Sequence, residues 1–109
     1  MLFKFKSKAC ADLIMLEPDG RRILLAMLGQ DPAKGIVQVA ELPAALQRLE
    51  AAVAEDEARR RAVTERQASG QADEADQALS AVRLAQRALP MQQMLRRCIA
   101  EEADLVWGV

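Results

Sequence analysis

The chain has 109 residues, of which 51% are apolar and 28% charged, and its formal net charge is −1. This length fits one domain with its own core, so we treat residues 1–109 as a single domain. A charge near zero provides no long-range field for nucleic acid, and no apolar run is long enough for a membrane span.

The chain opens with the alternation of a β-hairpin. Residues 2–6 (LFKFK) place Phe3 and Phe5 on one face and lysines on the other. Because the chain has only two Phe and one Trp, we expect both rings in the core and not stacked on single-stranded nucleic acid. After the connection SKACA, the apolar run DLIML (12–16) supplies the second strand.

A short helix follows. EPDG places Pro18 in the first turn of a helix expected over 18–28, and Gly29 is its natural stop. Its apolar residues recur at helical spacing: Ile23, Leu24, Met27 and Leu28. The next apolar stretch, IVQV (36–39), fits either a short strand or an extended connector.

A long helical hairpin is expected next. Its first arm runs from Pro43 to about residue 67, which is about 37 Å at 1.5 Å per residue, so its tip projects from a body of this size. The arm's apolar stripe is Leu42, Leu46, Leu49 and Val53, thinning to Ala58, Ala62 and Val63. ASGQA (68–72) places the turn near Gly70, and Asp73 caps an antiparallel second arm. The stripe of that arm is Ala75, Ala78, Leu79, Val82 and Leu89.

The last elements are a helix and a strand. An interior proline removes a backbone hydrogen bond, so we expect a kink or a break at Pro90. Helical spacing then resumes with Met91, Met94, Leu95, Cys98 and Ile99. LVWGV (105–109) has strand composition, and we expect it to pair beside residues 2–6. The sequence therefore predicts a two-layer α+β fold: a small antiparallel or mixed sheet, a short helix and a long antiparallel helical hairpin.

The most charged run is EDEARRR (55–61). Three arginines in a row could grip phosphate, but each is preceded by an acid four residues earlier: Glu55–Arg59, Asp56–Arg60 and Glu57–Arg61. This order favours neutralising pairs on a helix. We therefore interpret the run as a solvated helix face.

Residues for catalysis and metal binding are scarce. The chain has no histidine and no tyrosine, so the commonest general base and metal ligand are absent. Cys10 and Cys98 have no CxxC spacing and are expected to be reduced, Cys98 as a small core residue; Lys6 or Lys8 could lower the pKa of Cys10. The carboxylates Asp73, Glu74 and Asp76 lie at a helix start, where acids are stabilising anyway. We assign no catalytic, cofactor or metal residue.

Three stretches of the chain carry a family resemblance. They contain FKSKA (5–9), LPAAL (42–46) and MLRR (94–97) followed by VWG (106–108). With these marks the chain resembles the bacterial family known as domain of unknown function 1840. The resemblance implies a small cytoplasmic bacterial protein. It implies no activity, cofactor or site.

Three functions follow from these observations. The first is a non-enzymatic cytoplasmic interaction or structural protein, with an unidentified protein partner, that forms a homo-oligomer burying part of the hairpin. The second is a nucleic-acid accessory protein with a basic patch of Lys4, Lys6, Lys8, Arg21, Arg22, Arg96 and Arg97. The third is an enzyme that uses carboxylates or Cys10.

Overall fold

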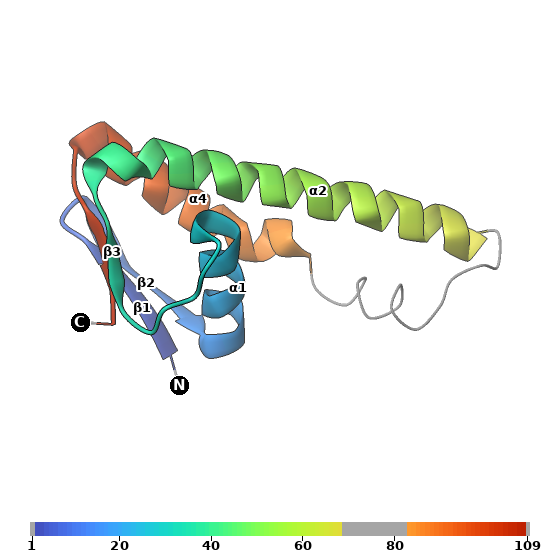
Figure 1. The fold of residues 1–109 in the computed structure, drawn as a ribbon, viewed down its shortest axis with the longest axis horizontal. Helices are drawn as coiled ribbons and strands as arrows, with labels where there is room; N and C mark the ends of the chain where they lie inside the picture. The colour runs from blue at the N-terminus through green and yellow to red at the C-terminus, as the bar shows by residue number, and fades with distance from the viewer. Residues whose placement is uncertain (1, 69–82, 109) are drawn as a thin grey trace.

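The computed structural model describes residues 2–68 and 83–108. These residues form an antiparallel sheet with helices packed against it (Figure 1). Its strands are β1 (Leu2–Ser7), β2 (Cys10–Leu16), β3 (Gly35–Val37) and β4 (Leu105–Trp107), in the order β2-β1-β4-β3. β4 pairs with β1 and with β3, which confirms the predicted place of the last strand. Residues 36–39 could form a strand or a connector; residues 36 and 37 belong to β3, and a 3-10 helix follows at Val39–Glu41.

The β1–β2 hairpin is tighter than predicted. Ser7 pairs with Cys10, so the turn is only Lys8 and Ala9, and β2 begins two residues before the expected start. The hydroxyl of Ser7 accepts a hydrogen bond from the Ala9 amide at 3.2 Å, which steadies this turn. Cys10 therefore belongs to a strand and not to a loop.

Helices cover one face of the sheet (Figure 1). They are α1 (Glu17–Leu28), α2 (Leu42–Ala68) and α4 (Leu84–Glu101), and α1 ends at Gly29 as predicted. α2 and α4 pack antiparallel, which confirms the predicted antiparallel packing of two helices. The predicted turn near Gly70, the cap Asp73 and the stripe from Ala75 to Val82 lie outside the described residues.

The sequence predicts a kink or a break at Pro90, and the break is wrong because α4 continues through this residue. The helix runs through Pro90 to Glu101. Ala88 and Met91, on either side, are fully buried, and their packing offsets the hydrogen bond that proline cannot make. Leu89, predicted on the inner stripe, is half exposed. The buried face of α4 is Leu84, Ala88, Met91, Met94, Leu95 and Cys98.

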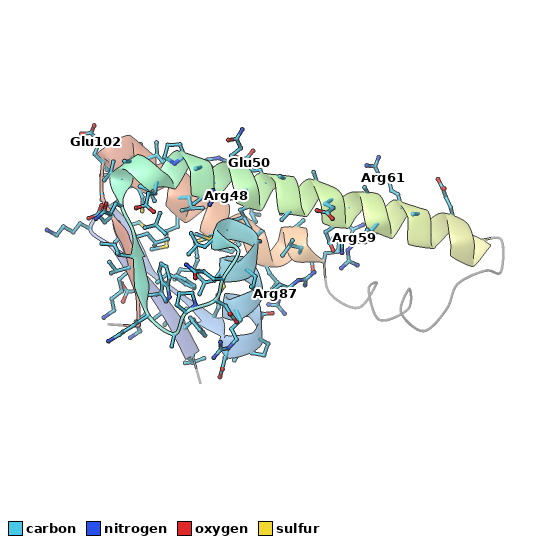
Figure 2. The ribbon with its side chains drawn as sticks, viewed as in Figure 1. Arg48, Glu50, Arg59, Arg61, Arg87 and Glu102 are labelled. Carbon is cyan, nitrogen blue, oxygen red and sulfur yellow. The ribbon has the colours of Figure 1, made fainter. Side chains whose placement is uncertain are left out.

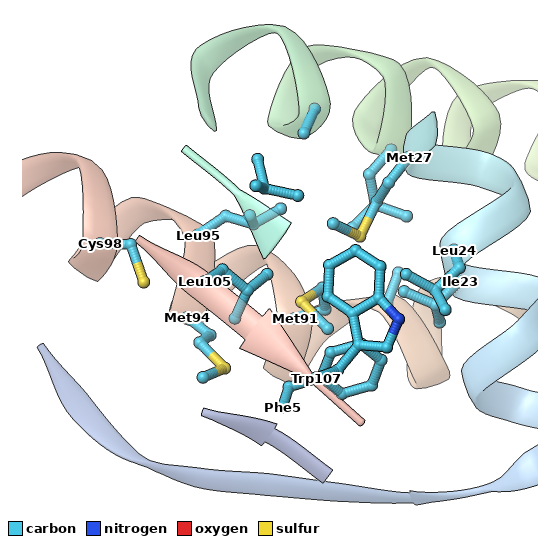
Figure 3. Packing of buried hydrophobic residues seen from close by; sticks show 14 of the residues in the cluster. Phe5, Ile23, Leu24, Met27, Met91, Met94, Leu95, Cys98, Leu105 and Trp107 are labelled. Atoms are coloured by element: carbon cyan, nitrogen blue, oxygen red, sulfur yellow. The ribbon is translucent and has the colours of Figure 1, made fainter. Parts of the chain in front are cut away.

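The core is centred on Trp107, which is buried beside Phe5 and the buried side chains of α1 and α4 (Figure 3). The Trp107 and Phe5 ring centroids are 6.0 Å apart. The indole Nε1 donates a hydrogen bond to the Pro32 carbonyl at 3.0 Å, so the polar group of the ring is satisfied. The burial of Phe3 and Phe5 confirms their predicted place in the core.

Two glycines allow the chain to close around this tryptophan. Gly35 lies against the indole, and a Cβ there would come within 2.6 Å of a ring carbon. Gly108 has a φ of 74°, in the left-handed region, and a Cβ there would collide with Ala33 and Lys34.

Candidate functional site

The sheet face opposite the helices carries an apolar surface. Ile14 is 53% exposed and Ile36 is 50% exposed, and both point away from the core. Leu2 and Leu16 pair with each other across β1 and β2 and are more than half exposed. We call these four residues, Leu2, Ile14, Leu16 and Ile36, the outer apolar face. The sequence held a signal for it, because residues 13–16 (LIML) are apolar on both faces of one strand.

A groove follows the free edge of β2 beside α4. It consists of two hollows, of about 240 Å³ and 300 Å³, that share Leu13 and Pro90 in their linings. We call it the edge groove. Its α4 side is formed by Gln86, Arg87, Pro90, Gln93, Met94 and Arg97, which recur at intervals of three or four and so share one helix face.

The lysines of the predicted basic patch do not gather with its arginines. Lys6 and Lys8 line a hollow of about 530 Å³ together with three carboxylates, those of Glu101, Glu102 and Asp104. The charges within this hollow therefore offset one another. Lys4 is exposed on the outer sheet face beside Ile14.

The arginines of the predicted patch lie near carboxylates. The guanidinium of Arg21 pairs with Glu17 at 2.9 Å and with Asp31 at 3.1 Å, and these hydrogen bonds raise its pKa. The remaining three pair as Arg22 with Asp56, Arg96 with Glu50 and Arg97 with Glu101. A phosphate backbone would have to compete with these carboxylates.

The EDEARRR run divides into an exposed part and a buried part. Glu55 and Arg59 form the expected exposed pair at 2.7 Å, and Arg61 extends from the face of α2 turned away from α1 (Figure 2). Glu57 lies 4.0 Å from Arg83, the residue that precedes α4. Asp56 and Arg60, however, are only 4% and 8% exposed. The prediction of a solvated face is wrong for this pair.

Asp56 joins three elements of the fold. Its Oδ2 accepts hydrogen bonds from Arg60 Nε at 2.8 Å and from the Leu84 amide at 3.2 Å, and its Oδ1 accepts one from Arg22 of α1 at 3.5 Å. Since Arg83 provides no side-chain cap, Asp56 acts as the N-terminal cap of α4 from a neighbouring helix. Burial alone would raise the pKa of Asp56. The hydrogen bonds from Arg60 and Leu84, with the charges of Arg60 and Arg22, hold that pKa below 3.8.

The two cysteines are free and belong to facing elements. Cys98 is fully buried, as predicted for a small core residue, and its Sγ donates a hydrogen bond to Ser7 Oγ at 3.2 Å. Burial raises the pKa of the Cys10 thiol, and the nearby Cys98 adds to this, while the charge of Arg97 opposes it. The hypothesis that Lys6 or Lys8 lowers this pKa is therefore wrong. A protonated thiol is a poor nucleophile.

The carboxylates considered as ligands, Asp73, Glu74 and Asp76, lie outside the described residues. Within residues 2–68 and 83–108, no three Cys, Asp or Glu side chains are grouped as metal ligands would be. In the same part of the chain, no helix is long and apolar enough to cross a membrane.

These features define a class of protein: a small α+β domain whose sheet has one helix-covered face and one open apolar face. The chain belongs to the family described as domain of unknown function (DUF1840), which matches residues 1–107. The family resemblance of the three sequence stretches is thereby confirmed. No curated protein and no solved structure matches the chain.

Proposed function

We propose that this protein is a cytoplasmic, non-enzymatic interaction protein that assembles into a homo-oligomer. The outer apolar face carries the proposal. It holds four large aliphatic side chains, each half or more exposed. Covering apolar surface stabilises a complex by about 25 cal/mol per Å², and paired exposed apolar side chains such as Leu2 and Leu16 favour an interaction site.

The projecting arm of α2 offers a second contact. α4 begins beside Asp56, and α2 continues for twelve residues beyond Asp56 to Ala68, which is about 18 Å at the helical rise. Ala62 lies on this arm and is half-buried. The proposal that part of the hairpin is buried between copies places Ala62 in that contact.

Light scattering coupled to size-exclusion chromatography tests the proposal. We expect a multiple of the 12.0 kDa chain mass at tens of micromolar, and a smaller species after Leu16→Lys or Ala62→Arg. The matched control on the arm is Arg61→Ala, since Arg61 is exposed. The buried Arg60 cannot serve as this control. A monomer at all concentrations would exclude the proposal.

A further inference from the structure

The two edges of the sheet are protected very differently. β3, at one edge, has only three residues, and Lys34 precedes it. β2, at the other edge, has seven residues (CADLIML), with no proline or glycine and only one charge, Asp12. Proteins that avoid edge-to-edge pairing shorten their edge strands or place lysine and proline there. β3 has this protection and β2 lacks it.

The edge groove leaves room beside β2. Within the described residues β2 pairs only with β1, so alternate backbone N–H and C=O groups of residues 10–16 point toward the groove. An added strand would bind these groups and rest on the α4 face that includes Pro90 and Met94. The groove therefore has the form of a strand-addition site.

The best-matched occupant of this site is β2 of a second copy. An antiparallel pair centred on Ile14 places the two Ile14 side chains opposite each other, and Leu16 of each copy, with Leu2 beside it, lies two residues away on the same face. Leu16 then lies opposite Asp12 of the second copy, so the two Asp12 side chains stand four residues apart, about 13 Å. That separation exceeds the Debye length of about 8 Å at physiological salt, so their repulsion is screened.

The ends of the groove also complement each other. Arg97 lines it at the Cys10 end and Asp19 lines it at the Leu16 end. Antiparallel pairing places the Leu16 end of one copy beside the Cys10 end of the other. Asp19, which pairs with Arg87 of its own copy at 3.5 Å, then approaches Arg97 of the other copy, which pairs with Glu101 at 2.9 Å. Opposite charges therefore meet at both ends of the groove, which favours this orientation.

We infer that two copies pair antiparallel through the free edges of β2, making one continuous sheet across a two-fold axis near Ile14. This inference rests on the proposed homo-oligomer and names its interface. Because the contact is isologous, each copy's edge is used once and this interface joins two copies only. The contact through Ala62 on the α2 arm would then join one such pair to another.

Two isoleucines provide a matched test. Ile14 and Ile36 lie on the same sheet face with nearly equal exposure, but at opposite edges. We expect Ile14→Lys to weaken dimerisation by tenfold or more, roughly, because an edge lysine opposes strand pairing, and Ile36→Lys to leave it unchanged. Circular dichroism and the fluorescence of the buried Trp107 verify that both variants are folded. If Ile36→Lys weakens the dimer equally, the copies associate through the open face and the inference fails.

Hydrogen exchange on the unmodified protein provides an independent measurement. In the dimer, the alternate amides of residues 10–16 that point toward the groove should exchange roughly tenfold or more slowly at high protein concentration than at low concentration. An oligomer whose β2 amides exchange equally at both concentrations would overturn the β2 interface and leave the homo-oligomer standing. A chain that stays monomeric would overturn both.

Discussion

Replacing Asp56 by alanine should destabilise the protein by about 3 kcal/mol. The change removes a carboxylate from beside the buried Arg60 guanidinium and from the first amide of α4. Breaking a buried ion pair costs about 3–5 kcal/mol and losing a helix cap about 0.5–2 kcal/mol, but the two effects share one side chain and do not simply add. The loss is large against the ~5–15 kcal/mol of a typical domain.

The assay is urea unfolding followed by circular dichroism, with Glu55→Ala as the matched control. Glu55 precedes Asp56 and also pairs with an arginine four residues on, but both partners are exposed, so its loss should cost at most about 0.5 kcal/mol. Equal effects of the two substitutions would refute the importance of burial at Asp56.

The same variant should show a defined pH dependence. The folded-state pKa of Asp56 is lowered from its ordinary value by the hydrogen bonds from Arg60 and Leu84. Its stabilisation is therefore complete above the unfolded pKa and is lost as the pH falls through the folded pKa. The stability difference between wild type and Asp56→Ala should therefore be constant from about pH 6 to 8 and shrink below about pH 4. A difference that instead changes near neutral pH contradicts this assignment.

Three further predictions concern the core, the thiols and nucleic acid. Trp107→Ala should cost about 3–5 kcal/mol, measured by thermal unfolding; a variant that keeps its Tm would contradict the packing around Phe5. Cys10 should be alkylated by iodoacetamide faster than the buried Cys98, at a rate still rising above pH 9, since burial raises its pKa; the reverse order would contradict the burial of Cys98. RNA and DNA should show no micromolar binding at physiological salt, and binding that Lys4→Glu with Lys6→Glu abolishes would show that the lysines act on nucleic acid.

Periodicity predicted the elements that bury an apolar stripe. Phe3 and Phe5, the α1 residues Ile23, Leu24 and Met27, and the face from Met91 to Cys98 are buried as predicted, and Leu28 is partly buried. Alternation and helical spacing directly record which side of an element faces the core. The pairing of residues 105–107 with β1 was also predictable, since a lone hairpin is only marginally stable.

The errors arise where tertiary packing outweighs local sequence. Pro90 favours a helix break, yet the burial of Ala88 and Met91 holds α4 together. Asp56 and Arg60 resemble an ordinary surface pair, although they extend the buried positions Leu42, Ala45 and Leu49 in steps of four or seven. A search for apolar residues at helical spacing misses buried positions that hold an ion pair, such as Asp56 and Arg60. It also cannot identify an open edge groove, which exists only once α4 lies beside β2.

The position of β4 in the middle of the sheet also affects how the protein is made. β1 and β3 are both present once residue 37 has been synthesised, but they do not touch; β4 separates them, and it ends at residue 107. Pairs such as Phe5 with Trp107 close a loop of about a hundred residues, and such non-local contacts slow folding. Until β4 has been synthesised, both edges of the β1–β2 hairpin therefore remain unpaired. In that interval a nascent chain would expose Phe5 and the backbone groups of β1, and these are the segments that a chaperone would shield.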